Sequence, residues 1–178
     1  MFSLPSIQKS VYESIELIER TFEQQGEVSS RKSFGQEQGW SFKCETTKAV
    51  FRNQAHMVRL TAVERKLPLV WLTKNHAAVD TLTNFLCHYA KVDPQKIVGG
   101  YMLESDFPKL TYACGKVAAS PLRICDVNSI DEFEEIVQVL AKENEFSFIL
   151  CDWDLSKKEL SIAESLAQKG NVTVCWPQ

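Results

Sequence analysis

The sequence predicts an α/β protein with a parallel sheet that is covered by helices on both faces. Short apolar runs alternate with segments of helical spacing from residue 48 to residue 176. These runs are almost continuously apolar, which is typical of strands buried on both faces. Ligands of such sheets bind beyond the carboxyl ends of the strands. Asp126 and Asp152 end two of the predicted strands and are therefore candidate site residues.

The first predicted element is a helix over residues 5–25. Its apolar side chains recur at steps of four, three and four, so they share one face: Val11, Ile15, Ile18 and Phe22. Gly26 is a plausible C-terminal stop. The polar stretch 26–41 then predicts a linker or surface loop, and a strand is expected at "WSFKCE" (40–45).

The remaining elements follow in alternation. Helices are predicted at 48–65, 76–90 and 105–118, then from Ser129 and from Ser156. Ser129 with Glu132, and Ser156 with Glu159, have the spacing of capping boxes. Strands are predicted at 67–73, 122–127, 146–152 and 172–176.

Composition favours one soluble domain. The chain has 178 residues, of which 44% are hydrophobic and 24% charged, and a net charge of −3. This charge argues against a surface that coats nucleic acid, so direct DNA binding is not expected. No signal peptide or membrane-spanning run is present, which predicts a cytoplasmic protein without membrane contact. The six cysteines form no CxxC pair and are interpreted as small buried hydrophobic residues in a reducing compartment.

A phosphate-binding loop is absent from the position where this fold class would carry it. Such a loop needs glycines so that backbone N–H groups can wrap the phosphates, followed by a lysine and a hydroxyl. The corresponding stretch is "CETTKAVF" (44–51), in which Thr47 and Lys48 resemble the end of the motif but no glycine precedes them. Thr47 and Lys48 are therefore only vestigial candidates for nucleotide binding.

Residues 79–155 resemble part of the C-terminal motor domain of DnaB-type replicative DNA helicases, which form hexameric rings of RecA-like fold. The resemblance is carried by the ordered pieces of "VDPQKIVGGYMLESDFPKLTYACGKVAASPLRICDV", a helix, and "FILCDWDL". "ESIELIERTFEQQGEVSS" resembles the linker helix that docks on a neighbouring subunit in that family. "NVTVCWPQ" resembles the strand after the metal-binding acid, with Gln178 near the position of a γ-phosphate contact. The resemblance implies a linker helix at 1–26, a linker at 27–41 and a truncated RecA-like domain at 42–178.

Departures from the family pattern imply lost catalysis. Asp152 matches the magnesium-associated acid, so a metal role carries over, although a structural strand-end role that caps the helix at 156 is favoured. Lys74 stands where the family has its catalytic glutamate, and a lysine cannot take a proton from water at neutral pH. We also expect the collar domain, the DNA-binding loops and the trans-acting arginine to be absent. Lys74, Asn75 and His76 are interpreted as a polar helix start.

These features predict a catalytically inactive, DnaB-like protein that acts in DNA replication by protein contact. Its partner would be the replicative helicase, or another copy of itself, bound through the apolar face of the N-terminal helix as a helix-in-groove contact. Folding of that helix onto its own domain is the open alternative. The alternative function is an ATP-binding, helicase-like ATPase with an irregular loop at 44–51. No cofactor is expected for the first function, whereas ATP and magnesium belong to the second.

Overall fold

The computed structural model describes residues 5–27, 45–74, 76–143, 148–169 and 172–177, and it confirms an α/β fold with a parallel sheet. The sheet has four strands in the order β2-β1-β3-β4, all parallel. In the register of the sheet, Leu72 lies opposite both Cys125 and Cys151. The strands are β1 (Leu69–Thr73), β2 (Leu122–Asp126), β3 (Phe148–Cys151) and β4 (Thr173–Cys175).

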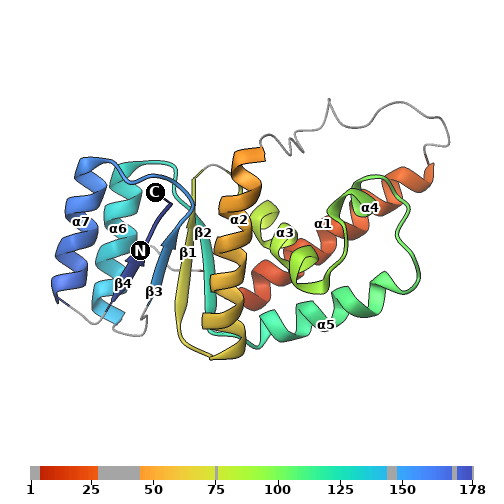
Figure 1. Cartoon of the computed structure of the whole chain (residues 1–178), viewed down its shortest axis with the longest axis horizontal. Coiled ribbons are helices and arrows are strands. Elements are labelled where there is room, and N and C mark those ends of the chain that lie inside the picture. The colour runs from red at the N-terminus through yellow and green to blue at the C-terminus, as the bar shows by residue number, and fades with distance from the viewer. Residues whose placement is uncertain (1–4, 28–44, 75, 144–147, 170–171, 178) are drawn as a thin grey trace.

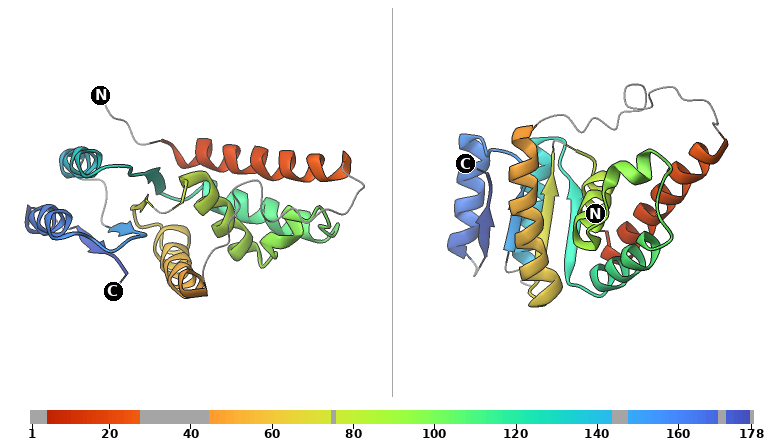
Figure 2. Two further views of the ribbon diagram at one scale, coloured as in Figure 1. Left: turned by 90° about the horizontal axis from the view of Figure 1, so that it is seen from above. Right: turned by 45° about the vertical axis from the view of Figure 1, so that its right-hand side comes forward.

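Helices cover the sheet on both faces, in three layers (Figures 1 and 2). One face carries α1 (Ile7–Glu27), α2 (Glu45–Val58) with its π-helical extension η1 (Arg59–Glu64), α3 (Ala78–Ala90), α4 (Pro94–Val98) and α5 (Asp106–Ala118). The other carries α6 (Ile130–Glu143) and α7 (Lys157–Lys169). The chain moves outward from β1 to β2 and then returns past β1 to β3. Right-handed crossovers in opposite directions place their helices on opposite faces, which explains the two layers.

The alternation of side chains along the strands creates two separate cores. Leu69 and Trp71 of β1 point into the core beneath α1–α5, while Val70 and Leu72 point into the core beneath α6 and α7. All four side chains are at most 1% exposed, so β1 is buried on both faces. This double burial is why its sequence lacks the alternating pattern of a half-exposed strand.

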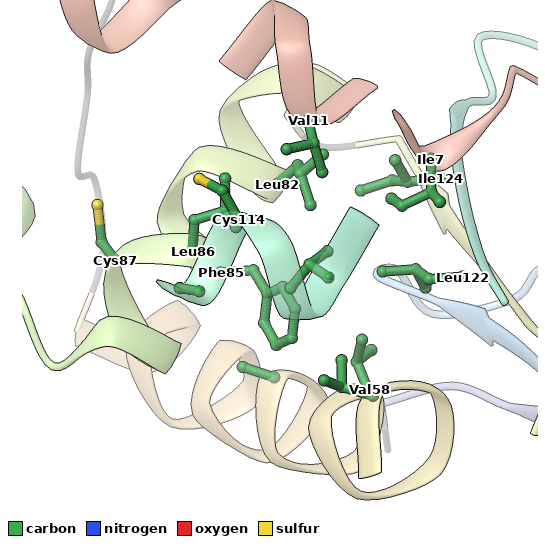
Figure 3. Close-up of a cluster of buried hydrophobic side chains, with 14 of the residues drawn as sticks. Ile7, Val11, Val58, Leu82, Phe85, Leu86, Cys87, Cys114, Leu122 and Ile124 are labelled. Atoms are coloured by element: carbon green, nitrogen blue, oxygen red, sulfur yellow. The ribbon is translucent and has the colours of Figure 1, made fainter. Parts of the chain in front are cut away.

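Helix α1 packs onto its own domain. Val11 lies beside Leu82 of α3, and Ile7 beside Ile124 of β2 (Figure 3). Ile18 is also buried and Ile15 is partly buried against the same core. The N-terminal helix is therefore found at the predicted position. Of the two arrangements that the sequence left open, docking on a partner or folding onto its own domain, the structure shows the second. The apolar face that was assigned to a partner is occupied within the chain; the side chain of Phe22 lies outside the described residues.

Most predicted elements are found, with differences at their ends. The predicted helix 48–65 begins earlier, at Glu45, and finishes as η1. Residue 45 is therefore helical, while the rest of the expected strand at 40–45 and most of the loop at 26–41 lie outside the described residues. The short helix α4 was not predicted. It begins at an Asp93 cap, whose carboxylate accepts the Gln95 N–H at 2.9 Å, with Pro94 in its first turn.

Within the described ranges, no helix combines the length and the apolar character needed to cross a lipid bilayer.

Candidate functional site

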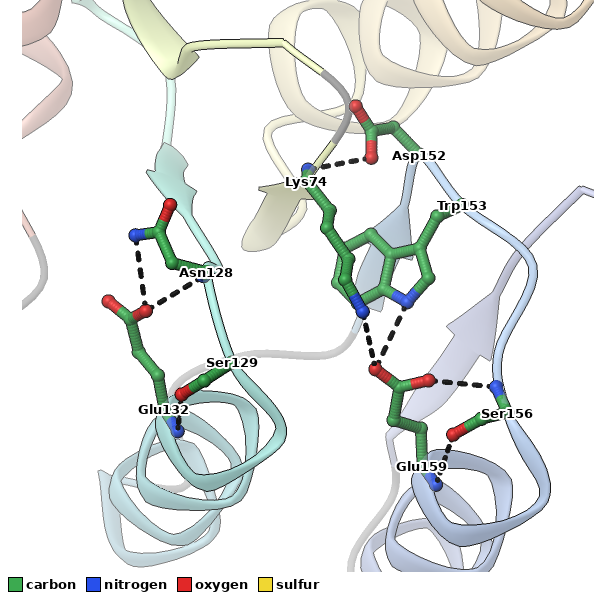
Figure 4. A network of polar contacts seen from close by, with 8 residues as sticks. All are labelled: Lys74, Asn128, Ser129, Glu132, Asp152, Trp153, Ser156 and Glu159. Carbon is green, nitrogen blue, oxygen red and sulfur yellow. Dashed lines mark hydrogen bonds and ion pairs between the residues drawn. The ribbon is translucent and has the colours of Figure 1, made fainter.

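The candidate site lies between the carboxyl ends of β1 and β3. The chain leaves β1 toward the α3 face and leaves β3 toward the α7 face, so the order of strands reverses here. In open α/β sheets a ligand-binding crevice forms at this switch point. Lys74 follows β1 and Asp152 follows β3, so the topology brings the predicted site residue Asp152 next to Lys74. The Lys74 backbone N–H donates to Oδ1 of Asp152 at 2.8 Å, and this bond bridges the two strand ends (Figure 4).

Glu159 of α7 is the centre of the polar contacts beside this bridge. Its Oε1 accepts a hydrogen bond from Nζ of Lys74 at 3.2 Å and another from Nε1 of Trp153 at 3.3 Å (Figure 4). Its Oε2 accepts the Ser156 N–H at 2.8 Å, and Oγ of Ser156 accepts the Glu159 N–H at 3.3 Å. The second pair of bonds is the predicted capping box of α7. We call Lys74, Asp152, Trp153, Ser156 and Glu159 the switch-point cluster.

The switch-point cluster keeps Glu159 ionised. Only 3% of its side chain is exposed, and this burial on its own would raise the pKa of the carboxyl group. The hydrogen bonds from Ser156 and the nearby Lys74 charge outweigh burial and hold the pKa of Glu159 below its usual value. The Lys74 ammonium also lies 5.5 Å from the centroid of the Trp153 ring. Its charge is therefore stabilised both by the Glu159 carboxylate and by the face of the indole ring.

Asp126 forms a separate set of contacts at the end of β2. Its Oδ1 accepts a hydrogen bond from the Ala78 N–H at 2.6 Å, and this bond caps the start of α3. The same oxygen accepts a hydrogen bond from the Thr73 hydroxyl at 3.2 Å. Asp80, in the first turn of α3, has its pKa raised by burial and by the charge of Asp126, and the nearby His76 partly offsets this. Asp126, the acid at the end of β2, thus caps the start of α3, which is a structural role.

The other predicted site residues are only partly placed. Thr47 and Lys48 lie in the first turn of α2, which begins beyond the carboxyl ends of the strands (Figure 1), but their side chains are outside the described residues. Gln178 is also outside them. The cap of α7 comes from Ser156, whereas Asp152 receives the Lys74 N–H. The Asp152 carboxylate therefore links the end of β3 to the end of β1 in this structure.

Sequence reasoning missed two members of this region. Gln54 of α2 donates from Nε2 to the Cys151 carbonyl oxygen at 3.0 Å and ties the helix to the end of β3. Trp153 gave no signal beyond its place after a strand. Glu159 was found as a capping residue, but its contacts with Lys74 and Trp153 arise only when β1 and β3 become neighbours.

The described residues contain no group of three or more histidine, cysteine, aspartate or glutamate side chains positioned to hold a metal ion. Four cysteines are buried as predicted: Cys87, Cys114, Cys125 and Cys151. Burial raises the pKa of Cys87 and of Cys125 to about 12, so these thiols stay protonated and unreactive at neutral pH. Cys175 is half-buried, and Cys44 lies outside the described residues.

Comparison with known proteins adds no relative: no protein-family model matches the chain, and no curated protein matches its sequence.

Proposed function

We propose that this protein is a catalytically inactive, DnaB-helicase-like protein that acts in DNA replication by protein contact. It would bind and regulate the replicative helicase, or associate with copies of itself. The observation that supports the proposal best is the state of the switch point. The Lys74 N–H bonds to the Asp152 carboxylate, which a nucleotide-hydrolysing site would use for its metal, and the Lys74 ammonium pairs with Glu159.

The chemistry of hydrolysis does not fit these residues. A general base must be able to accept a proton from water, and the Lys74 ammonium cannot do so. Glu159 is a carboxylate, but it is 3% exposed and receives three hydrogen bonds, so water does not reach it as it would reach a base. Magnesium prefers several oxygen ligands, whereas Asp152 lies against an N–H donor next to a lysine. These contacts argue against magnesium at Asp152.

The architecture is consistent with the proposal. Four parallel strands with helices on both faces suit the RecA-like fold that the sequence resemblance implies. Helix α1 packs against α3, α4, α5 and β2, and this packing within one chain resembles a helix-in-groove contact. Residues 28–44 join α1 to α2, and 17 residues (44 − 28 + 1) can span up to about 55–60 Å. The same groove and the same helix can therefore be exchanged with another copy or with a related helicase subunit.

Isothermal titration of the full-length protein against the replicative helicase of its host tests this proposal. We expect saturable binding, and sedimentation of the protein alone measures the self-association branch. A protein that gives no binding heat with the helicase and stays monomeric at every concentration would contradict both branches.

The alternative function, an ATP-binding ATPase, has one observation in its favour. Helix α2 begins beyond the carboxyl ends of the strands (Figure 1), and a helix N-terminus attracts phosphate. A ligand that binds only the folded state raises its apparent stability by mass action. We expect no change in melting temperature at millimolar ATP with magnesium. A rise that depends on nucleotide concentration would favour the ATPase instead.

A further inference from the structure

Exposed apolar side chains are concentrated on one short stretch of the chain. Among the described residues, six large hydrophobic side chains are exposed, and four of them fall between residues 101 and 112. They are Tyr101, Leu103, Phe107 and Tyr112, each between 44% and 61% exposed. This stretch runs from the loop after α4 into α5, at the end of the molecule farthest from α6 and α7 (Figures 1 and 2). We call these four residues the α5 patch.

Contacts beneath the α5 patch hold it in place. The ring of Tyr101 lies so close to Gly99 that a Cβ atom at that position would collide with it. At the start of α5, the Asp106 carboxylate accepts the Leu103 N–H at 3.3 Å and pairs with Nζ of Lys96 at 2.9 Å. A surface that is ordered in advance loses little conformational freedom when a partner binds. The α5 patch therefore meets a requirement of a tight binding surface.

The exposed side of α5 carries a row of residues whose size falls along the helix. Phe107, Thr111 and Gly115 are exposed and lie four residues apart, and Leu103 lies four residues earlier, in the turn that leads into α5. A glycine inside a helix weakens it relative to alanine. No atom from elsewhere in the described chain lies within 4 Å of the position that a Cβ of Gly115 would take. Packing within the described chain therefore does not explain this glycine.

We propose that two copies of this protein associate through this row, with their α5 helices antiparallel about a two-fold axis. Leu103 of one copy then faces Gly115 of the partner subunit, and Phe107 faces the partner's Thr111, so a large side chain meets a small one in each pair. Both pairs are centred on the same residue, Lys109, and therefore fit one axis. Rows of side chains four residues apart interdigitate in the commonest class of helix packing. A two-fold contact uses the same surface on both copies and closes at a dimer.

The size of the α5 patch suits such a dimer. A large side chain exposes about 200 Å² when it is fully accessible, so four that are about half exposed present about 400 Å² of largely apolar surface on each copy. A standard interface buries about 800 Å² per partner, of which somewhat more than half is apolar. The α5 patch can therefore supply most of the apolar contact that a stable dimer needs. The inference rests on the self-association branch of the proposed function and assigns a surface to it.

Apolar packing rather than charge drives this contact. The row from Leu103 to Gly115 in steps of four contains no charged residue. The ammonium of Lys109 lies 3.2 Å from Oδ1 of Asp106, and that of Lys116 lies 5.4 Å from the centroid of the Tyr112 ring. Nucleic acid is bound mainly through cations that neutralise its phosphates. A second copy, which supplies a matching apolar row, is therefore the better partner for this surface.

Sedimentation velocity of the full-length protein over a range of concentrations tests the contact. We expect a reversible dimer that persists at high salt, because salt does not screen apolar burial. Gly115→Leu should weaken dimerisation by about tenfold or more, since its side chain fills the space that the partner's Leu103 needs. Leucine is a better helix former than glycine, so the melting temperature of the monomer should not fall. Glu164→Leu on the exposed side of α7 is the matched control and should leave dimerisation unchanged.

An exchange of large and small side chains tests the pairing itself. Phe107→Thr removes the large side chain, and Thr111→Phe places two large side chains face to face, so each change alone should weaken dimerisation by about tenfold. The double variant F107T/T111F again places a large residue opposite a small one. It should therefore dimerise more tightly than either single variant.

Two results would overturn the contact. One is a protein that stays monomeric at every concentration, and the other is a dimer that neither Gly115→Leu nor the exchange of side chains changes. Neither result removes the proposed function. Helicase binding in isothermal titration would remain in the first case, and self-association through another surface, such as exchange of α1, would remain in the second. The proposed function fails only if the parent protein neither binds the helicase nor associates with itself.

Discussion

Helices α6 and α7 lie on the same face of the sheet and begin with the same signature, a serine followed three residues later by a glutamate. At α7 the capping box is reciprocal, because Ser156 and Glu159 each bond to the backbone N–H of the other. At α6 Oγ of Ser129 accepts the Glu132 N–H at 3.1 Å, but the Glu132 carboxylate reaches back to the Asn128 N–H at 2.8 Å (Figure 4). Both signatures therefore start a helix.

The difference between the two glutamates comes from their place in the fold. Glu132 is half-exposed, and its carboxylate bonds to Asn128, four residues earlier in the chain. Glu159 is buried at the switch point, where it also accepts bonds from Lys74 and Trp153. A local capping signal thus becomes a tertiary contact only where strand order brings a cation and an indole to the same carboxylate.

Removal of Glu159 should have the largest effect in this comparison. The change Glu159→Ala leaves the Trp153 N–H and the Ser156 N–H without their acceptor, and the Lys74 ammonium without its carboxylate. We expect a loss of about 3 kcal/mol in the free energy of unfolding, measured by urea denaturation. Glu164→Ala on the exposed side of α7 is the matched control and should change stability by less than about 0.5 kcal/mol. Equal losses in the two variants would contradict a central role for Glu159.

Acid should reduce the contribution of Glu159. The pKa of Glu159 lies below the usual value of 4.5, so the folded state stabilises the ionised form of this carboxyl group more than the unfolded chain does. The resulting stability is present above about pH 4.5 and is lost as the pH falls through the folded pKa. We expect Glu159→Gln to be less stable than the parent by about 1–2 kcal/mol at pH 7, and this difference should shrink as the pH approaches 3. A constant difference across this range would show that the charge on Glu159 is unimportant.

The same contrast shows how far sequence predicts this molecule. Continuous apolar runs predicted the buried strands, and strand ends pointed to Asp126 and Asp152 as candidate site residues, whereas Lys74 was interpreted as part of a polar helix start. The role of Glu159 beyond capping could not be predicted, because residues 74–147 separate β1 from β3 and nothing local specifies that the two strands pair. The apolar stripe of α1 showed that one side must be buried, but periodicity does not say which groove covers it.

The smallest effect is expected at the other capping box. Glu132→Ala removes an acceptor for the Asn128 N–H and side-chain amide, both of which are exposed and can bond to water instead. The Ser129 cap remains, because its bond uses the Glu132 backbone rather than the side chain. We therefore expect a loss of about 0.5–1 kcal/mol in the free energy of unfolding, measured by urea denaturation. A loss as large as that of Glu159→Ala would mean that helix capping, rather than the switch-point contacts with Lys74 and Trp153, explains the importance of Glu159.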